Sequence, residues 1–200
     1  MTRKATRIMT AAMVALLVAG GCYAAELAIG DAAPDWSGIV GTDDKEHSLS
    51  DYKDAKLIVL VFTCNHCPVA KAYEDRLVEL QKDYKSKGVQ VIALNVNNLA
   101  ADKLEPMKKR ATEKEFNFPY IYDPSQKTGR DYGGRVTPHA FVLDGDRKLA
   151  YAGAIDDNNS PDKVKNHFVR DALDALLSGK EVAVAETNAR GCGIKWDKKK

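Results

Sequence analysis

The chain has 200 residues, of which 44% are hydrophobic and 29% charged. This balance is that of a globular protein and excludes a disordered or fibrous one. The formal net charge of +2 provides no concentrated basic patch, which argues against nucleic acid or an anionic membrane surface as a partner.

The N-terminus has the pattern of a secretory signal peptide. Arg3, Lys4 and Arg7 precede an uncharged run over residues 8–25, and its apolar core is too short for a membrane span. Cleavage after Ala24 would remove residues 1–24. The 30 Lys and Arg less these three leave 27, against 28 Asp and Glu, a net charge of −1. A buried N-terminal helix is the alternative.

A second form of export is also compatible with this segment. Ala19-Gly20-Gly21-Cys22 is similar to a lipoprotein processing site, in which Cys22 would carry the lipid and provide the only membrane attachment. Both readings place the mature protein outside the cytoplasm, in the periplasm or another extracytoplasmic space.

The elements after the signal alternate between strands and helices. Residues 25–180 are predicted to form one domain, and residues 181–200 a tail. Apolar runs and periodicities predict the elements of the first half in this order: a short strand near 36–40, a strand over 57–62, a helix over 68–84 and a strand over 89–96. A helix over 102–115 follows, and Asp102 with Glu105 has the spacing of a capping box at its start. The second half is predicted to contain a strand over 120–122, a helix over 125–132, a hairpin of 139–143 with 148–155, and a closing helix over 164–177. This order predicts an α/β fold, with a central mixed sheet flanked by helices on both faces.

The chemistry is predicted to centre on Cys64-Asn65-His66-Cys67-Pro68, between the strand and the helix. A helix N-terminus favours a thiolate and lowers a thiol pKa. Cys64 is therefore the expected exposed nucleophile, and Cys67 is the expected resolving thiol. A metal site is disfavoured because no second Cys-x-x-Cys motif follows. Redox catalysis is preferred to a metal site or an inert disulfide.

His66 and Cys192 have two readings each. As an imidazolium, His66 would stabilise a Cys64 thiolate and make the couple more oxidising; otherwise it is a solvated loop residue. Cys192, between Gly191 and Gly193, is either a third redox thiol or a tail cysteine without a role. Loss of Cys22 would leave three cysteines in an oxidising compartment, and an odd number indicates a free or exchanging thiol.

The run Phe62–Pro68, the Thr137-Pro138 pair before a strand, and the ending Gly191–Trp196 resemble the thioredoxin superfamily, most closely its exported redoxin branch related to alkyl hydroperoxide reductase/thiol-specific antioxidant proteins. The resemblance implies a thioredoxin-like fold and a cis Pro138 lying against the cysteine pair. Thr137 and Asn65 would help to position substrate.

The sequence also departs from these families. Thioredoxin carries Trp-Cys-Gly-Pro-Cys, whereas this chain has Thr63 before the pair and Asn65-His66 within it. Strand 57–62 also lacks the buried acid that assists the resolving cysteine in thioredoxin. Redoxin peroxidases carry Pro-x-x-x-Thr/Ser-x-x-Cys, whereas Leu57 and Val61 occupy those positions here. Antioxidant peroxidase activity is therefore secondary.

The preferred function is an exported thiol–disulfide oxidoreductase that maintains cell redox balance. Its partners would be protein thiols or disulfides and an electron donor or acceptor. No cofactor or metal is expected beyond the Cys64–Cys67 disulfide itself. The alternatives are a thiol peroxidase and a copper-binding chaperone, since two close thiolates beside a histidine suit Cu(I).

Overall fold

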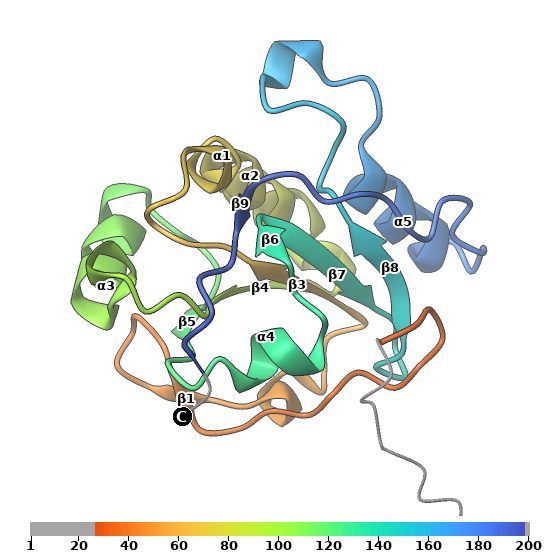
Figure 1. The fold of residues 1–200 in the computed structure, drawn as a ribbon. Helices are drawn as coiled ribbons and strands as arrows, with labels where there is room; N and C mark the ends of the chain where they lie inside the picture. The colour runs from red at the N-terminus through yellow and green to blue at the C-terminus, as the bar shows by residue number, and fades with distance from the viewer. Residues whose placement is uncertain (1–26, 199–200) are drawn as a thin grey trace, which may run out of the picture.

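The structure is a computed structural model that describes residues 27–198 (Figure 1). The predicted signal peptide, with Ala24 and Cys22, lies outside the described residues. Within residues 27–198, no helix is long and apolar enough to cross a membrane.

Nine strands lie along the described part of the chain: β1 (Ile39–Val40), β2 (Glu46–His47), β3 (Leu57–Phe62), β4 (Val89–Asn95), β5 (Tyr120–Tyr122), β6 (Val136–Thr137), β7 (His139–Leu143), β8 (Leu149–Gly153) and β9 (Cys192–Gly193). Five of them form a mixed sheet in the order β5-β4-β3-β7-β8. The β5-β4-β3 half is parallel, and β7 and β8 add to it antiparallel. Two short ribbons, β1 with β2 and β6 with β9, accompany the sheet.

The helices cover both faces of this sheet, as predicted for an α/β fold (Figure 1). Helices α2, α3 and α5 pack on one face, and α4 and the N-terminal segment pack on the other. The α-helices are α1 (Pro68–Lys71), α2 (Glu74–Tyr84), α3 (Leu104–Glu113), α4 (Lys127–Asp131) and α5 (Phe168–Leu177); short 3-10 turns are η1 (Leu49–Tyr52), η2 (Lys85–Lys87), η3 (Ala100–Asp102) and η4 (Pro161–Lys163).

The central strand β3 explains why the core has two halves. All six of its residues are buried. Because successive side chains of a strand point to opposite faces, Leu57, Val59 and Val61 join the cluster with α2 and α5. The other three residues join the cluster under α4. The site that follows β3 is therefore attached to the most deeply buried strand.

All four predicted helices have different bounds in the structure. The helix predicted over 125–132 is shorter, as α4 (Lys127–Asp131). The helix predicted over 68–84 is divided at Ala72–Tyr73 into α1 and α2. The helix predicted over 102–115 begins at Leu104 with Lys103 as its N-cap, so the Asp102–Glu105 capping box is wrong. The closing helix begins at Phe168, because η4 and extended backbone at Val164 precede it.

The C-terminal tail crosses the molecule and returns to the end of the sheet at which the cysteine pair lies. In Figure 1 it is the dark blue segment that passes α5, runs beside β6 and ends near β1. It is held to β8 by the Thr187 N–H, which donates to the Ala152 carbonyl (3.0 Å). Further along, Ile194 is buried in the core under α4, and the Lys195 N–H donates to Asn97 Oδ1 (2.8 Å).

Candidate active site

The predicted cysteine pair lies where β3 turns into α1. Cys67 is the N-cap of α1, and its sulfur accepts a hydrogen bond from the Ala70 N–H (3.4 Å). Pro68 occupies the first helical position, where a missing N–H costs nothing because that group has no helical partner. The unpaired N–H groups of the first turn favour negative charge, and they act on Cys67.

Thr137 joins both sulfurs. Its hydroxyl is 3.0 Å from Cys64 Sγ in a hydrogen bond that either group can donate. Its carbonyl accepts a hydrogen bond from the Cys67 thiol (3.3 Å). The Thr137–Pro138 peptide bond is cis, as the family resemblance implies. The structure thus brings the pair Cys64 and Cys67 together with the Thr137-Pro138 segment, which follows 70 or more residues later in the chain.

Both sulfurs are covered. Cys64 is 2% exposed and Cys67 is fully buried, and Cys192 of the tail packs against them. The prediction of an exposed Cys64 is therefore wrong, because the β6 segment and the tail lie over the pair.

The electrostatics of the two thiols also differ from the prediction. Burial raises the pKa of the Cys64 thiol to about 12, and the charges of Asp102 and Cys67 add to this rise against the opposing hydrogen bond of Thr137. Burial raises the pKa of Cys67 as well, but hydrogen bonds from the Cys192 thiol and the Ala70 N–H outweigh it, so this pKa lies below its ordinary value. Compared with Cys64, whose pKa burial raises, the thiolate is favoured at Cys67, because Cys67 receives hydrogen bonds from the Cys192 thiol and, as the N-cap of α1, from the Ala70 N–H.

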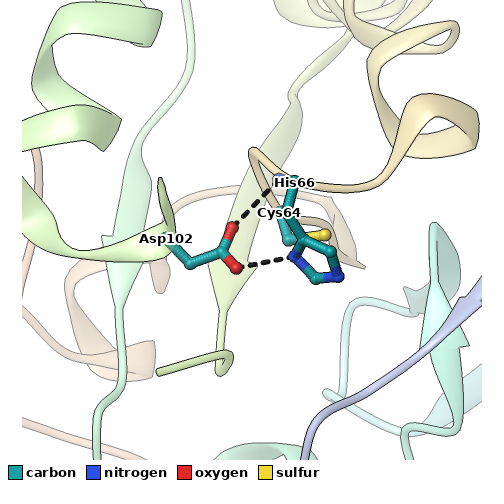
Figure 2. A group of neighbouring side chains, drawn as sticks. All are labelled: Cys64, His66 and Asp102. Carbon is teal, nitrogen blue, oxygen red and sulfur yellow. Dashed lines mark hydrogen bonds and ion pairs between the residues drawn. The ribbon is translucent and has the colours of Figure 1, made fainter. Parts of the chain in front are cut away.

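His66 forms a close pair with Asp102 beside Cys64 (Figure 2). Its Nδ1 lies 2.6 Å from Asp102 Oδ2, and the other carboxylate oxygen accepts the backbone N–H groups of Asn65 (2.8 Å) and His66 (3.2 Å). A carboxylate only accepts hydrogen bonds, so Nδ1 carries a proton, and in the neutral ring Nε2 keeps a free lone pair. Nε2 is buried and has no hydrogen-bond partner among the described residues.

The side-chain amide of Asn65 binds η3 and β5. Its Nδ2 donates to the Ala101 carbonyl (3.0 Å), and its Oδ1 accepts from the buried Tyr120 hydroxyl (3.0 Å). These contacts hold the loop against η3 and β5. Both ends of the side-chain amide therefore bind the protein, and the substrate-positioning role of Asn65 stays a prediction. Tyr120 and Trp36 are buried in the core.

Asp102 is the residue that sequence reasoning missed. Its carboxylate is buried and organises the loop 36 residues earlier in the chain. The sequence pattern assigns Asp102 to a capping box with Glu105, and this local role gives no indication of a contact with His66. The signal available was its position shortly after a buried parallel strand, the edge at which α/β proteins gather functional groups.

A pocket of about 400 Å³ adjoins the cis-proline. Pro138, Tyr73, Asp156 and Arg190 are among its lining residues. The pocket offers both apolar surface and charges of both signs beside the reacting segment, as a polypeptide substrate would require.

The same centre contains atoms that could hold a metal ion. Cys64, His66 and Asp102 each offer one ligand atom, and these atoms lie within 4.8 Å of one another. A sulfur, nitrogen and oxygen set suits Zn²⁺ better than Cu(I), which prefers soft ligands. Binding through Asp102 would compete with the hydrogen bonds that its oxygens already accept.

Comparison with known proteins decides the family. The chain matches the Redoxin family over residues 28–167. The chain belongs to the redoxin family. This redoxin has the thioredoxin-like fold that the sequence predicts, and its matched region contains the cysteine pair, Asp102 and Pro138.

Individual relatives and solved structures extend the comparison. The thiol-disulfide oxidoreductase ResA of Geobacillus kaustophilus is 32% identical, over 59% of this chain and 64% of its own length, so the chain spans less than two thirds of that relative. An uncharacterized conserved protein of the same organism has a structure with 36% identity and a TM-score of 0.81, covering 87% of this chain and 95% of that one. A protein from Chlorobium tepidum named as a thiol:disulfide interchange protein DsbE has 28% identity and a TM-score of 0.57, covering 64% of this chain and 85% of that one.

Proposed function

We propose that this redoxin is an exported thiol–disulfide oxidoreductase that works through Cys64 and Cys67. The observation that carries the proposal is the contact of both sulfurs with Thr137, next to the cis-proline. It is supported by the lowered pKa of Cys67 and by relatives named for thiol–disulfide exchange.

The reaction is two successive exchanges. Cys64 Sγ attacks a substrate disulfide, forming a mixed disulfide and releasing one substrate thiolate. Cys67 Sγ then attacks Cys64 Sγ, which closes the Cys64–Cys67 disulfide and releases the second substrate thiolate. The substrate is reduced by two electrons and the cysteine pair is oxidised by two. The reverse sequence donates a disulfide.

His66 is the proton acceptor for Cys64 in this proposal. A ring nitrogen of His66 is within 4.8 Å of Cys64 Sγ, and the buried Nε2 has no hydrogen-bond partner among residues 27–198. Taking the proton leaves an imidazolium, whose charge the buried Asp102 carboxylate stabilises. Burial raises the pKa of the Cys64 thiol to about 12, so Cys64 loses its proton more readily when a nearby group accepts it.

No bound cofactor enters the proposal, since the disulfide itself carries the electron pair. The partners are protein thiols or disulfides on one side and an electron donor or acceptor on the other. Export follows from the pattern of residues 1–24. Cell fractionation with mass measurement of the mature N-terminus tests it: a cytoplasmic protein starting at Met1 would contradict export, and lipid on Cys22 would identify the anchored form.

The deciding experiment is equilibration of the mature protein in glutathione buffers, followed by alkylation and mass mapping. A reversible Cys64–Cys67 disulfide that is lost in Cys64→Ser and in Cys67→Ser supports the function. A potential of about −120 to −200 mV assigns disulfide donation or isomerisation, and one below roughly −250 mV assigns reduction of substrates. A pair that remains reduced across the whole range overturns the proposal.

A further inference from the structure

The tail places a third thiol next to the cysteine pair. β9 pairs antiparallel with β6, and Cys192 lies opposite Thr137 in the register. Thr137 is the residue that contacts both Cys64 and Cys67. The Cys192 thiol hydrogen-bonds Cys67 and packs in the same cluster. Cys67 thus has two potential disulfide partners, Cys64 and Cys192.

The position of Cys192 is fixed from both sides. Before it, Thr187 is bound to β8 through Ala152. After it, Ile194 donates its N–H to the Arg135 carbonyl (3.0 Å) and is buried in the core. A thiol held between two anchors has a high effective concentration at its neighbour and loses little further entropy when a bond forms.

We propose that Cys192 is a third redox thiol, and that Cys67 is the sulfur shared by two alternating disulfides, Cys64–Cys67 and Cys67–Cys192. The proposal rests on the proposed function, because the Cys64–Cys67 disulfide is the species on which Cys192 acts. Cys192 Sγ attacks Cys67 Sγ; the Cys67–Cys192 bond forms, and the Cys64–Cys67 bond breaks. Cys192 gives up its proton and Cys64 takes one, so no electron enters or leaves the protein.

The exchange moves the disulfide toward solvent. Cys64 and Cys67 are buried, whereas Cys192 is partly exposed. A partner thiolate can reach Cys192 Sγ without entering the covered pocket of Cys64. The partner class is therefore a protein dithiol that attacks Cys192, while small or extended substrates react at Cys64.

The sequence makes the two disulfides separable by trypsin. Cleavage after Lys56 and Lys71 places Cys64 and Cys67 in one peptide, residues 57–71, and cleavage after Arg190 and Lys195 places Cys192 in residues 191–195. A Cys64–Cys67 bond stays inside the first peptide. A Cys67–Cys192 bond links the two peptides.

The test uses full-length mature Cys64→Ser, reduced and then exposed to oxidised glutathione, quenched by alkylation and digested. We expect the linked peptides 57–71 and 191–195, with loss of two hydrogen masses from the protein. The matched control is Cys67→Ser, in which Cys64 and Cys192 remain. Since the hydrogen bond of the Cys192 thiol is to Cys67, we expect a Cys64–Cys192 bond to form at least about tenfold more slowly. Glutathione on Cys67 together with an alkylated Cys192 in Cys64→Ser overturns the proposal.

Wild-type protein separates this inference from the proposed function. In the same buffers we expect both peptide patterns. One outcome is a disulfide inside peptide 57–71 of wild type with no linked peptides in either protein. This outcome supports the oxidoreductase function and refutes the role of Cys192. Linked peptides in Cys64→Ser without any Cys64–Cys67 bond in wild type overturn both the proposed function and the internal exchange.

Discussion

The reactivity of the site depends on the difference between two cysteines that are three residues apart. Cys67 gains hydrogen bonds that favour its thiolate, and its pKa falls. Cys64 is buried next to the negative charge of Asp102, and its pKa rises to about 12. A nucleophile in that environment would be assisted by a nearby proton acceptor, the role proposed above for His66.

The first prediction concerns His66. In His66→Ala, the rate at which reduced Cys64 attacks a small disulfide at neutral pH should fall by about 10², since general-base assistance contributes on this scale. Asp102→Asn should also lower the rate, because an amide at this position no longer holds the proton on Nδ1 and no longer stabilises the imidazolium. The measurement is the pH profile of the stopped-flow rate.

The matched control is His167→Ala, which changes a histidine at the N-cap of α5. Its pH profile should coincide with that of wild type. A His66→Ala profile superimposable on wild type would refute the role of His66 as proton acceptor.

At the scale of elements, the β6–β9 ribbon determines access to the sulfurs. Its two glycines differ sharply in their surroundings. A Cβ added at Gly191 would lie 2.0 Å from the Thr137 carbonyl oxygen, whereas a Cβ at Gly193 would have nothing within 4 Å. Gly191 permits a close backbone approach that no other residue allows.

The second prediction follows from that difference. Gly191→Ala should force β9 away from β6 and increase the alkylation rate of Cys64 and Cys67 in reduced protein by about tenfold or more, as protection then reflects local opening. Gly193→Ala should leave the rate near that of wild type. Equal protection in the two variants would show that the ribbon does not cover the pair.

A third prediction concerns the contact between α2 and α3. Glu74 is buried and receives the Arg110 guanidinium, with Arg110 Nε 2.8 Å from Oε1. Arg110→Ala would leave a buried carboxylate without its counterion and should lower the free energy of unfolding by about 3 kcal/mol. Lys109→Ala, at an exposed neighbouring position, should change it by less than about 0.5 kcal/mol. Urea unfolding of all three proteins measures both effects.

The sequence predicts the elements well where burial alone decides. The run over 57–62 is a central strand because it is apolar on both faces, and β3 has those bounds. The division of 68–84 could not be predicted, since Leu77, Leu80 and Tyr84 continue the apolar period on the same face. The bond from the Tyr73 hydroxyl to Asp156 (2.9 Å) joins residues 83 positions apart at that division.

The site was predictable only in its local part. Cys64, Cys67 and the cis Pro138 follow from motifs in the chain. The partner of His66 is Asp102, and the neighbour of Cys67 is Cys192. These contacts depend on how distant segments pack, and no periodicity encodes them. The reversal of the expected pKa order has the same cause, because burial by β6 and the tail decides it.

For the whole molecule, the raised pKa of Cys64 predicts how stability depends on pH. The folded protein holds this proton more tightly than the unfolded chain, so the stabilisation is complete below the unfolded pKa of 9.0 and is lost as pH rises toward about 12. Between pH 7 and pH 10 the loss should be roughly 1 kcal/mol for reduced protein.

Denaturant unfolding of reduced wild type and Cys64→Ser at a series of pH values measures this contribution. The difference between the two curves isolates Cys64 from the buried tyrosines Tyr132 and Tyr151, whose pKa values burial also raises. Parallel curves up to pH 10 would mean that Cys64 titrates normally in the folded protein.

β9 follows every strand of the five-stranded sheet along the chain, and none of its residues belongs to that sheet. The sheet can therefore assemble while Cys64 and Cys67 are still uncovered by the tail, and Cys192 reaches the pair only when β9 docks on β6. A chain cleaved before Gly191 would lack this cover. We expect such a cleaved form to be the one most open to oxidation and to mixed disulfides with other proteins.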